Sequence, residues 1–315
     1  MDIIFFGSSE FAVAPFKSLL ASKHRILGVV TRQDKKSGRG QKMTISPIKS
    51  LAAEEGLSVW QPNDLRELKF LQSLKAAAPE LFVVCSYGKI LTKEVLQIPK
   101  RYAINLHASV LPKYRGAAPI NWAIINGESL TGISIFKMNE FIDRGQIILE
   151  KKIKITPKDT SASLSKKLTD LGAAGLIETL ELIELEKVKL KKQDQSKGSL
   201  APKLKKKDGL INWQDTALEI HNRIRGLQPW PSAFTYFENK LLKIWWSEVR
   251  LSPGHVNSGQ SSPGEIMAID QTGMLVQTGQ GQLLITSVQL EGKRKVPCSE
   301  FILGHKIEIN QKLGK

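Results

Sequence analysis

Short apolar runs alternate with stretches of helical periodicity through the first half of the chain. Four runs are typical of buried strands: residues 3–6, 26–30, 81–85 and 103–106. Between the first two, residues 9–20 place apolar side chains at helical spacing. Ser46-Pro47 would cap and open a further helix that stops at Gly56. The alternation predicts a Rossmann-like α/β domain, a mostly parallel sheet with helices on both faces.

The second half of the chain has a different pattern. A helix is expected over 161–186, and the lysine-rich, polar stretch that follows indicates a linker. Later apolar runs, such as 240–246 and 274–278, are short and separated by Gly and Pro. They are typical of a small β-barrel, similar to the oligonucleotide-binding (OB) type. We therefore predict a catalytic domain over 1–186, a basic linker over 187–208 and an OB-like domain over 209–315.

The charge of the chain indicates an anionic partner. The formal net charge is +16, from 46 basic and 30 acidic residues. Residues 186–208 alone contain nine basic and three acidic side chains. Net charge bears on association and solubility and says nothing about the reaction.

Composition also limits the class of protein. The two cysteines, Cys85 and Cys298, are far apart, so neither a disulfide framework nor a cysteine metal site is predicted. We expect Cys85 to be a buried free thiol. No apolar segment approaches the ~20 residues of a membrane span, and the first residues are typical of a strand rather than a signal peptide. A soluble, cytoplasmic protein is expected.

Polar residues and glycines follow several predicted strands. Gly7, Tyr87-Gly88 and the stretch 105–107 lie at carboxyl ends, where parallel sheets bind ligands. Gly7-Ser8-Ser9 lacks the second and third glycines of the dinucleotide fingerprint, so no nicotinamide cofactor is predicted.

Three residues in this region are candidates for chemistry. Asn105 and His107 are two apart on a strand, so their side chains share a face. A histidine can exchange a proton near neutral pH, and an amide can donate to a developing oxyanion, an interaction worth ~3–4 kcal/mol. Asp143, in a turn between two apolar segments, would orient His107 or raise its basicity. The alternatives are a structural histidine at a strand end and an ordinary Asp-x-Gly turn.

The order of these residues resembles the folate-dependent formyltransferase family. Asn105-x-His107 is followed at once by Ser109-Val110-Leu111-Pro112, and then by Asp143-x-Gly145. The resemblance implies that Asn105, His107 and Asp143 are catalytic. It also implies a formyl donor, 10-formyltetrahydrofolate, and no metal. The implied folate-binding residues are Tyr87, Gly88, Ser109, Val110, Leu111 and Pro112.

Other segments resemble the branch of this family that formylates the α-amino group of methionine on initiator tRNA. They are 32–42, 115–120, 201–203, 208–213 and 225–231, and matches extend past residue 290. The resemblance implies that Arg39, between Gly38 and Gly40, enters the acceptor arm of the tRNA. The other implied tRNA-binding residues are Lys36, Lys42, Lys203, Lys205, Lys206 and Lys207, although a solvated loop and linker would have the same composition.

Several questions stay open at this stage. Phe141 stands where the family usually has Gly, and Gln146 where it often has an acid. The acceptor amine must be neutral to attack, and either His107 or Asp143 would remove its proton. The rival functions are formylation of another amine, in a sugar nucleotide or glycinamide ribonucleotide, and noncatalytic RNA binding. A monomer is expected.

Overall fold

The computed structural model describes residues 1–37, 42–250 and 261–314. The chain divides into two compact units. The first unit comprises Met1–Pro119, Leu130–Lys154 and Ser165–Pro202. The second comprises Ile120–Ser129, Ile155–Leu164 and Lys203–Lys315. The boundaries of the catalytic domain, linker and OB-like domain, at 186/187 and 208/209, stay predictions.

The first unit contains a seven-stranded sheet and two smaller two-stranded sheets. Its strands are β1 (Asp2–Gly7), β2 (Arg25–Val30), β3 (Lys35–Ser37), β4 (Lys42–Thr44), β5 (Ser58–Trp60), β6 (Leu81–Cys85), β7 (Tyr102–His107), β8 (Arg115–Gly116), β9 (Leu130–Lys137), β10 (Gln146–Lys154) and β11 (Leu200–Ala201). Its helices are α1 (Val13–Leu20), α2 (Pro47–Glu54), α3 (Leu68–Ala76), α4 (Lys93–Leu96) and most of α6 (Ser161–Glu184), with 3-10 turns η1 (Glu10–Ala12) and η2 (Gln195–Lys197).

The strand order of the seven-stranded sheet is β10-β9-β7-β6-β1-β2-β5. The strands from β7 to β5 are parallel, and β9 runs antiparallel to both of its neighbours. The predicted mostly parallel sheet is confirmed. Because β6 and β7 are parallel neighbours, their carboxyl ends lie at the same edge of the sheet, where ligands bind in this class of fold.

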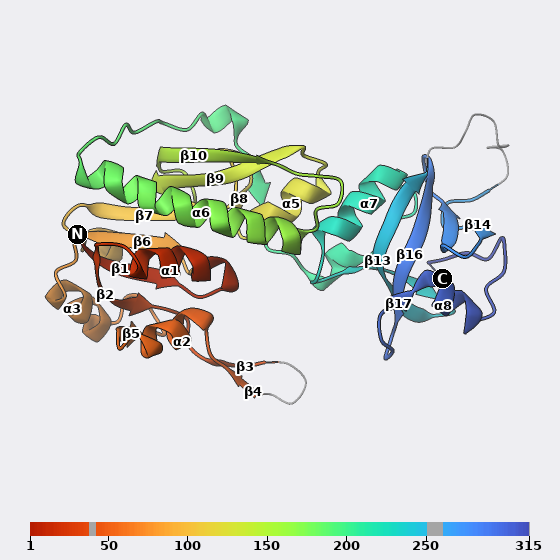
Figure 1. The fold of residues 1–315 in the computed structure, drawn as a ribbon, viewed down its shortest axis with the longest axis horizontal. Helices are drawn as coiled ribbons and strands as arrows, with labels where there is room; N and C mark the ends of the chain where they lie inside the picture. The colour runs from red at the N-terminus through yellow and green to blue at the C-terminus, as the bar shows by residue number, and fades with distance from the viewer. Residues whose placement is uncertain (38–41, 251–260, 315) are drawn as a thin grey trace. The chain divides into compact units, whose positions relative to one another are not determined.

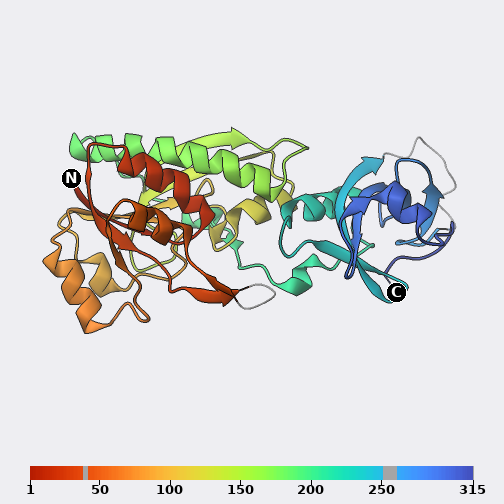
Figure 2. The same ribbon diagram turned by 60° about the horizontal axis from the view of Figure 1, so that its bottom comes forward.

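Helices cover both faces of the sheet. On β1, Phe5 lies 4.8 Å from Phe16 of α1, measured between ring centroids. The next residue, Phe6, points the other way and packs in a cluster with Phe70 and Leu74 of α3. Figures 1 and 2 show α1 and α6 on one face of the sheet. β1 is thus buried on both faces, which explains its continuous apolar run.

Local sequence signals explain where several elements begin and end. Ser46 caps α2, because its side chain accepts a hydrogen bond from the backbone N–H of Lys49. Gly56 follows that helix with a φ of +65°, a conformation that favours glycine. The helix expected over 9–20 opens instead as the 3-10 turn η1 and continues as α1. Cys85 is a buried free thiol, as predicted.

The second unit contains a six-stranded antiparallel sheet. Its strands are β12 (Ala233–Phe237), β13 (Lys240–Arg250), β14 (Ile266–Ile269), β15 (Met274–Gln277), β16 (Gln282–Leu290) and β17 (Val296–Pro297). Its helices are most of α5 (Pro119–Ile125), α7 (Ala217–Gly226), α8 (Cys298–Leu303) and the 3-10 turn η3 (Lys206–Gly209). The order is β12-β13-β16-β15-β14, with β17 beside β16.

Residues near the C-terminus connect the two ends of this sheet. The backbone N–H of Leu313 donates to Gly264, just before β14, and that of Gly314 donates to Tyr236 in β12. These bonds reduce the open edges of the sheet and give it a barrel-like closure. Within the described ranges, no helix is long and apolar enough to cross a membrane.

Candidate active site

Asn105 and His107 lie two residues apart at the carboxyl end of β7, so their side chains leave the same face of the sheet. β7 pairs with β6 on one side and β9 on the other, which fixes its backbone. His107 is only 6% exposed. Its Nε2 lies 2.9 Å from the carbonyl oxygen of Tyr114. Because a carbonyl only accepts hydrogen bonds, Nε2 donates, and neutral His107 then has its lone pair on Nδ1.

Asp143 brings a carboxylate to these two side chains from the turn between β9 and β10. Its Oδ2 lies 3.6 Å from Nδ1 of His107, and its Oδ1 lies 3.5 Å from Nδ2 of Asn105. Both distances exceed the ~2.9 Å of a strong N–H···O bond. A shorter bond, 2.8 Å, comes from the backbone N–H of Gly116 to Oδ2. The structure therefore brings the three predicted catalytic residues together, with Nδ1 of His107 facing the Asp143 carboxylate.

Close packing explains the glycine of the Asp-x-Gly turn. A Cβ on Gly145 would lie 1.8 Å from the carbonyl oxygen of Lys137, so no side chain fits there. Asp143 itself has a φ of +51°, which is uncommon outside glycine but better tolerated by Asp and Asn. Phe141, where the family usually has Gly, is 58% exposed. Its side chain therefore does not fill the space around Asn105, His107 and Asp143.

Gln193 was not singled out from the sequence, but it contacts the turn that carries Asp143. Its Nε2 donates to the carbonyl oxygens of Asp143 and Gly145, both at 2.8 Å. Its Oε1 accepts from Arg115, at 2.6 Å from Nη2 and 3.2 Å from Nε. No local motif marks Gln193, because its partners lie about 50 and 78 residues away in the sequence.

Arg115 places a buried positive charge beside the cluster. It is 4% exposed, and a buried guanidinium requires strong hydrogen-bond partners. Burial lowers the pKa of Arg115, the charge of Arg144 lowers it further, and Asp143 opposes both. Gly116, the next residue, donates to Asp143. Arg115 therefore connects Gln193 to the carboxylate through one peptide unit.

The segment predicted to line the folate pocket is partly buried. Ser109 is fully buried, and its hydroxyl donates to the carbonyl of Lys113 at 2.6 Å. Leu111 packs against Phe136 and Ile147 in a small apolar cluster. Val110 and Pro112 are half-buried. Ser109 and Leu111 thus shape this segment from inside, whereas Val110 and Pro112 have the exposure that contact with a ligand requires.

Tyr87 and Gly88 follow β6 after one residue, Ser86. The ring of Tyr87 is buried, 5.5 Å edge-on from that of Phe6. Burial raises the pKa of Tyr87 to about 12, although the charge of Arg32 opposes the shift. Its hydroxyl has no hydrogen-bond partner among the described residues. Gly88 is exposed with a φ of +83°, and a Cβ there would come within 3.3 Å of the Arg32 guanidinium.

The predicted tRNA-binding residues occupy two separate segments. Lys36 and Lys42 lie on the β3–β4 hairpin, in which Lys36 pairs with Met43 and Ser37 with Lys42. Arg39 lies outside the described residues. In the second unit, a run of exposed lysines opens with Lys203 and continues at and into η3: Lys205, Lys206 and Lys207.

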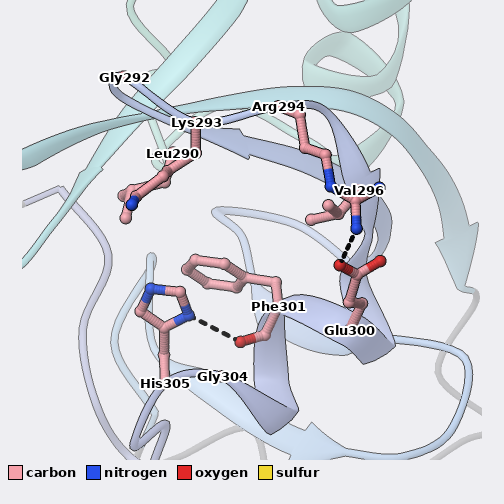
Figure 3. Close-up of a pocket in the computed structure, with 9 residues that line it drawn as sticks. All are labelled: Leu290, Gly292, Lys293, Arg294, Val296, Glu300, Phe301, Gly304 and His305. Atoms are coloured by element: carbon pink, nitrogen blue, oxygen red, sulfur yellow. Dashed lines mark hydrogen bonds and ion pairs between the residues drawn. The ribbon is translucent and has the colours of Figure 1, made fainter.

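A hollow also lies in the C-terminal unit, between the β16–β17 turn and α8 (Figure 3). Two of its charged side chains, Arg294 and Glu300, are paired with each other. Nη2 of Arg294 lies 2.5 Å from a carboxylate oxygen of Glu300, and Nδ1 of His305 lies 2.9 Å from the carbonyl of Phe301. Across the described part of the chain, no group of His, Cys, Asp and Glu is placed to hold a metal ion. The strand-end cluster of the first unit is therefore the better candidate.

The fold and this cluster define an α/β group-transfer domain followed by a small antiparallel sheet. The chain belongs to the formyl transferase family. The model of the formyl transferase domain matches residues 1–180, and that of the family's C-terminal domain matches residues 203–306.

Two relatives match the full length of the chain, and one solved structure shares its fold. The methionyl-tRNA formyltransferase of Geobacter sulfurreducens is 40% identical, over 100% of this chain and 97% of that protein. The methionyl-tRNA formyltransferase of Alkaliphilus oremlandii is 42% identical, over 100% of this chain and 100% of that protein. The sugar 3N-formyl transferase WlaRD, solved with dTDP and 5-N-formyl-THF, matches with a TM-score of 0.67 at 20% identity. That match covers 93% of this chain and 99% of WlaRD and demonstrates a common fold.

Proposed function

We propose that this chain is an enzyme that transfers the formyl group of 10-formyltetrahydrofolate to the α-amino group of methionyl initiator tRNA. The observation that carries the proposal is the meeting of Asn105, His107 and Asp143 at one strand edge in a formyl transferase. The acceptor is supported by relatives that share about two-fifths of their sequence with the whole chain and are methionyl-tRNA formyltransferases. The net charge of +16 fits an anionic acceptor.

His107 and Asp143 act as one acid–base unit in this proposal. The Nε2–H of His107 is held by the carbonyl of Tyr114, so only Nδ1 can gain a proton. Nδ1 faces Oδ2 of Asp143. A proton taken from the attacking amine is shared between these two atoms, whichever receives it first, and is later returned to the leaving nitrogen.

Asn105 supplies the hydrogen-bond donor for the formyl oxygen as that oxygen gains negative charge. Its Nδ2 makes only a long contact, 3.5 Å, with Asp143. That N–H can therefore turn to a better acceptor at small cost. A donor placed in this way typically stabilises the transition state by ~3–4 kcal/mol.

The residues after β6 and β7 fit the folate donor, which supplies the activated formyl group when bound. Val110 and Pro112 offer half-buried apolar side chains, and Gly88 offers an exposed main chain. This mixture suits a flat ring system with amide-like edges. Tyr87, Ser109 and Leu111 would support the pocket from behind.

In the proposed enzyme, basic residues in two segments bind the tRNA. Lys36, Arg39 and Lys42 would meet its acceptor arm. Lys203, Lys205, Lys206 and Lys207 would neutralise backbone phosphates in a sequence-independent, salt-sensitive manner. A cytoplasmic, monomeric enzyme completes the proposal.

The test is a formylation assay on the purified full chain. The protein is mixed with 10-formyltetrahydrofolate and methionyl initiator tRNA, and formyl-methionine is measured after mild base hydrolysis. We expect turnover by the wild type, its loss in His107→Ala, and normal turnover in the control His305→Ala, whose ring contacts the Phe301 carbonyl.

Alternative acceptors are tested in parallel in the same assay. An elongator methionyl-tRNA should be a poor substrate. Formylation of an amino sugar nucleotide or of glycinamide ribonucleotide, with none on the tRNA, would overturn the acceptor and leave the catalytic assignment standing. Tight tRNA binding without any formyl transfer would favour a noncatalytic RNA-binding protein.

A further inference from the structure

Gln193 uses its whole side-chain amide inside the first unit. It donates two hydrogen bonds, to the carbonyl oxygens of Asp143 and Gly145, and accepts two from Arg115. A primary amide has two N–H donors and two acceptor lone pairs, so its capacity is filled. The side chain is also buried, with the residue 8% exposed. A polar side chain this fully engaged constrains the segments that it joins.

Two of these bonds hold the main chain of the turn that presents the carboxylate. Asp143 has a φ of +51°, a conformation that surrounding contacts must maintain. Its carbonyl is bound by Gln193, while its carboxylate contacts His107 and Gly116. Loss of these two bonds alone would release the main chain on the C-terminal side of Asp143.

The other two bonds act on the opposite side of the carboxylate. Arg115 is held by Oε1 of Gln193, and the N–H of the following residue, Gly116, donates to Oδ2 of Asp143 at 2.8 Å. Gln193 thus anchors both the residue that carries the carboxylate and the strand that binds it.

The same segment fixes the partner of His107. Ser199 accepts from the N–H of Tyr114 through its hydroxyl and from the N–H of Arg115 through its carbonyl, both at 2.9 Å. The carbonyl of Tyr114 is the acceptor for Nε2 of His107. Residues 193–199, in the segment predicted to be a linker, therefore support both members of the acid–base pair.

We propose that Gln193 is a positioning residue for formyl transfer, which keeps the carboxylate of Asp143 beside Nδ1 of His107. This inference rests on the proposed function. The Nδ1 to Oδ2 distance is already 3.6 Å. Further separation would break the pair, and a misplacement of ~1 Å can reduce the rate ~100-fold.

The decisive variant is Gln193→Glu, which keeps the shape of the side chain and the acceptor for Arg115. It replaces the donor toward Asp143 and Gly145 with a second oxygen, which repels both carbonyls. An ion pair with Arg115 would help to keep the segment folded. We expect kcat to fall ~10- to 100-fold, while KM for both substrates changes by less than ~3-fold. The melting temperature should change by no more than a few degrees.

The matched control is Gln72→Glu, the same chemical change at an exposed position of α3 in the same unit. Its kinetics should equal those of the wild type. If Gln193→Glu does not fold, Gln193→Asn is the second variant, because its amide is intact but one methylene too short to reach both partners.

A spectroscopic readout makes the test independent of turnover. The chain has five histidines, so side-chain NMR signals of His107 can be assigned by their absence in His107→Ala. In Gln193→Glu the His107 signals should shift, and the other four sets should stay in place.

An unchanged kcat would overturn the positioning role. So would unmoved His107 signals, or a loss of activity that only follows the loss of folded protein. The proposed function is judged separately, from the wild-type rate on each acceptor. The Gln193 inference is judged from the ratio of variant to wild type on whichever amine is formylated, and from the NMR signals.

Discussion

Both units bury histidines, and the surroundings of His107 and His221 differ. His107 in the first unit is 6% exposed and faces the carboxylate of Asp143. His221 in the second unit is 9% exposed, bonds the hydroxyl of Ser247 at 3.0 Å and lies edge-on to Trp246. Burial lowers the pKa of His221 to about 4, with help from the charge of Arg225.

Burial alone therefore does not distinguish the proposed catalytic histidine from a structural one. His221 is kept neutral by its surroundings and forms a hydrogen bond with the hydroxyl of Ser247 in the core of its unit. His107 instead faces a carboxylate, at the edge of the sheet where ligands bind in this class of fold. The following experiments test this contrast, and their expected effects decrease in order.

The largest effect is expected from Asp143→Asn. The substitution keeps an oxygen for the N–H of Gly116 but removes the charge opposite Nδ1 of His107. We expect kcat to fall ~10²- to 10⁴-fold, the usual range for general acid–base catalysis. Single-turnover formyl transfer with saturating substrates measures it. A loss of less than ~10-fold would contradict the role of the carboxylate.

A smaller effect on the same step is expected from Asn105→Ala. Removal of one oxyanion donor typically reduces kcat ~10²- to 10³-fold. The KM values should change little, because the hydrogen bond forms mainly in the transition state. Steady-state kinetics separates the two parameters. A rise in KM at constant kcat would instead assign Asn105 to ground-state binding.

His221 should affect stability and leave catalysis unchanged at neutral pH. Its folded pKa, about 4, lies below the unfolded value of ~6.5. The unfolded chain therefore binds the proton first as pH falls, and stability is lost between ~6.5 and ~4. The loss attributable to His221 is ~2–3 kcal/mol at pH 4.5.

The measurement is urea unfolding, followed by tryptophan fluorescence, at pH 7 and pH 4.5 for the wild type and His221→Gln. The glutamine can still bond Ser247 but does not titrate. A pH-dependent loss equal in both proteins would show that other groups cause it.

The smallest effect is expected from single alanine substitutions at Lys205, Lys206 and Lys207. Each should weaken tRNA binding modestly and reduce the slope of log K against log salt by up to ~1, because one phosphate fewer is neutralised. Filter binding between low and moderate salt measures the slope, and kcat should not change. An unchanged slope in all three variants would place the phosphate-binding residues elsewhere.

Local signals predicted much of the first unit from the sequence. The apolar runs gave β1, β6 and β7 nearly to the residue, because strands buried on both faces are continuous in sequence. Ser46 and Pro47 marked the start of α2, since capping depends on neighbouring residues. Asn105 and His107 followed from their spacing on one strand.

Long-range contacts could not be predicted in the same way. Nothing near Gln193 indicates that it will meet a turn 50 residues earlier, because that meeting depends on the whole fold. The same holds for Leu313 and Gly314, which bond to Gly264 and Tyr236. The burial of Ser109 and Leu111 could not be predicted either, since a motif identifies a segment but not which of its side chains face inward.

The central claim is that His107 and Asp143 act as one unit, and a double-mutant cycle tests it most directly. Single-turnover rates are measured for the wild type, His107→Ala, Asp143→Asn and the double variant. If the two residues share one proton, the double variant should be no slower than the slower single variant, within a factor of ~3. If the two losses multiply instead, the residues act independently and the claim is wrong.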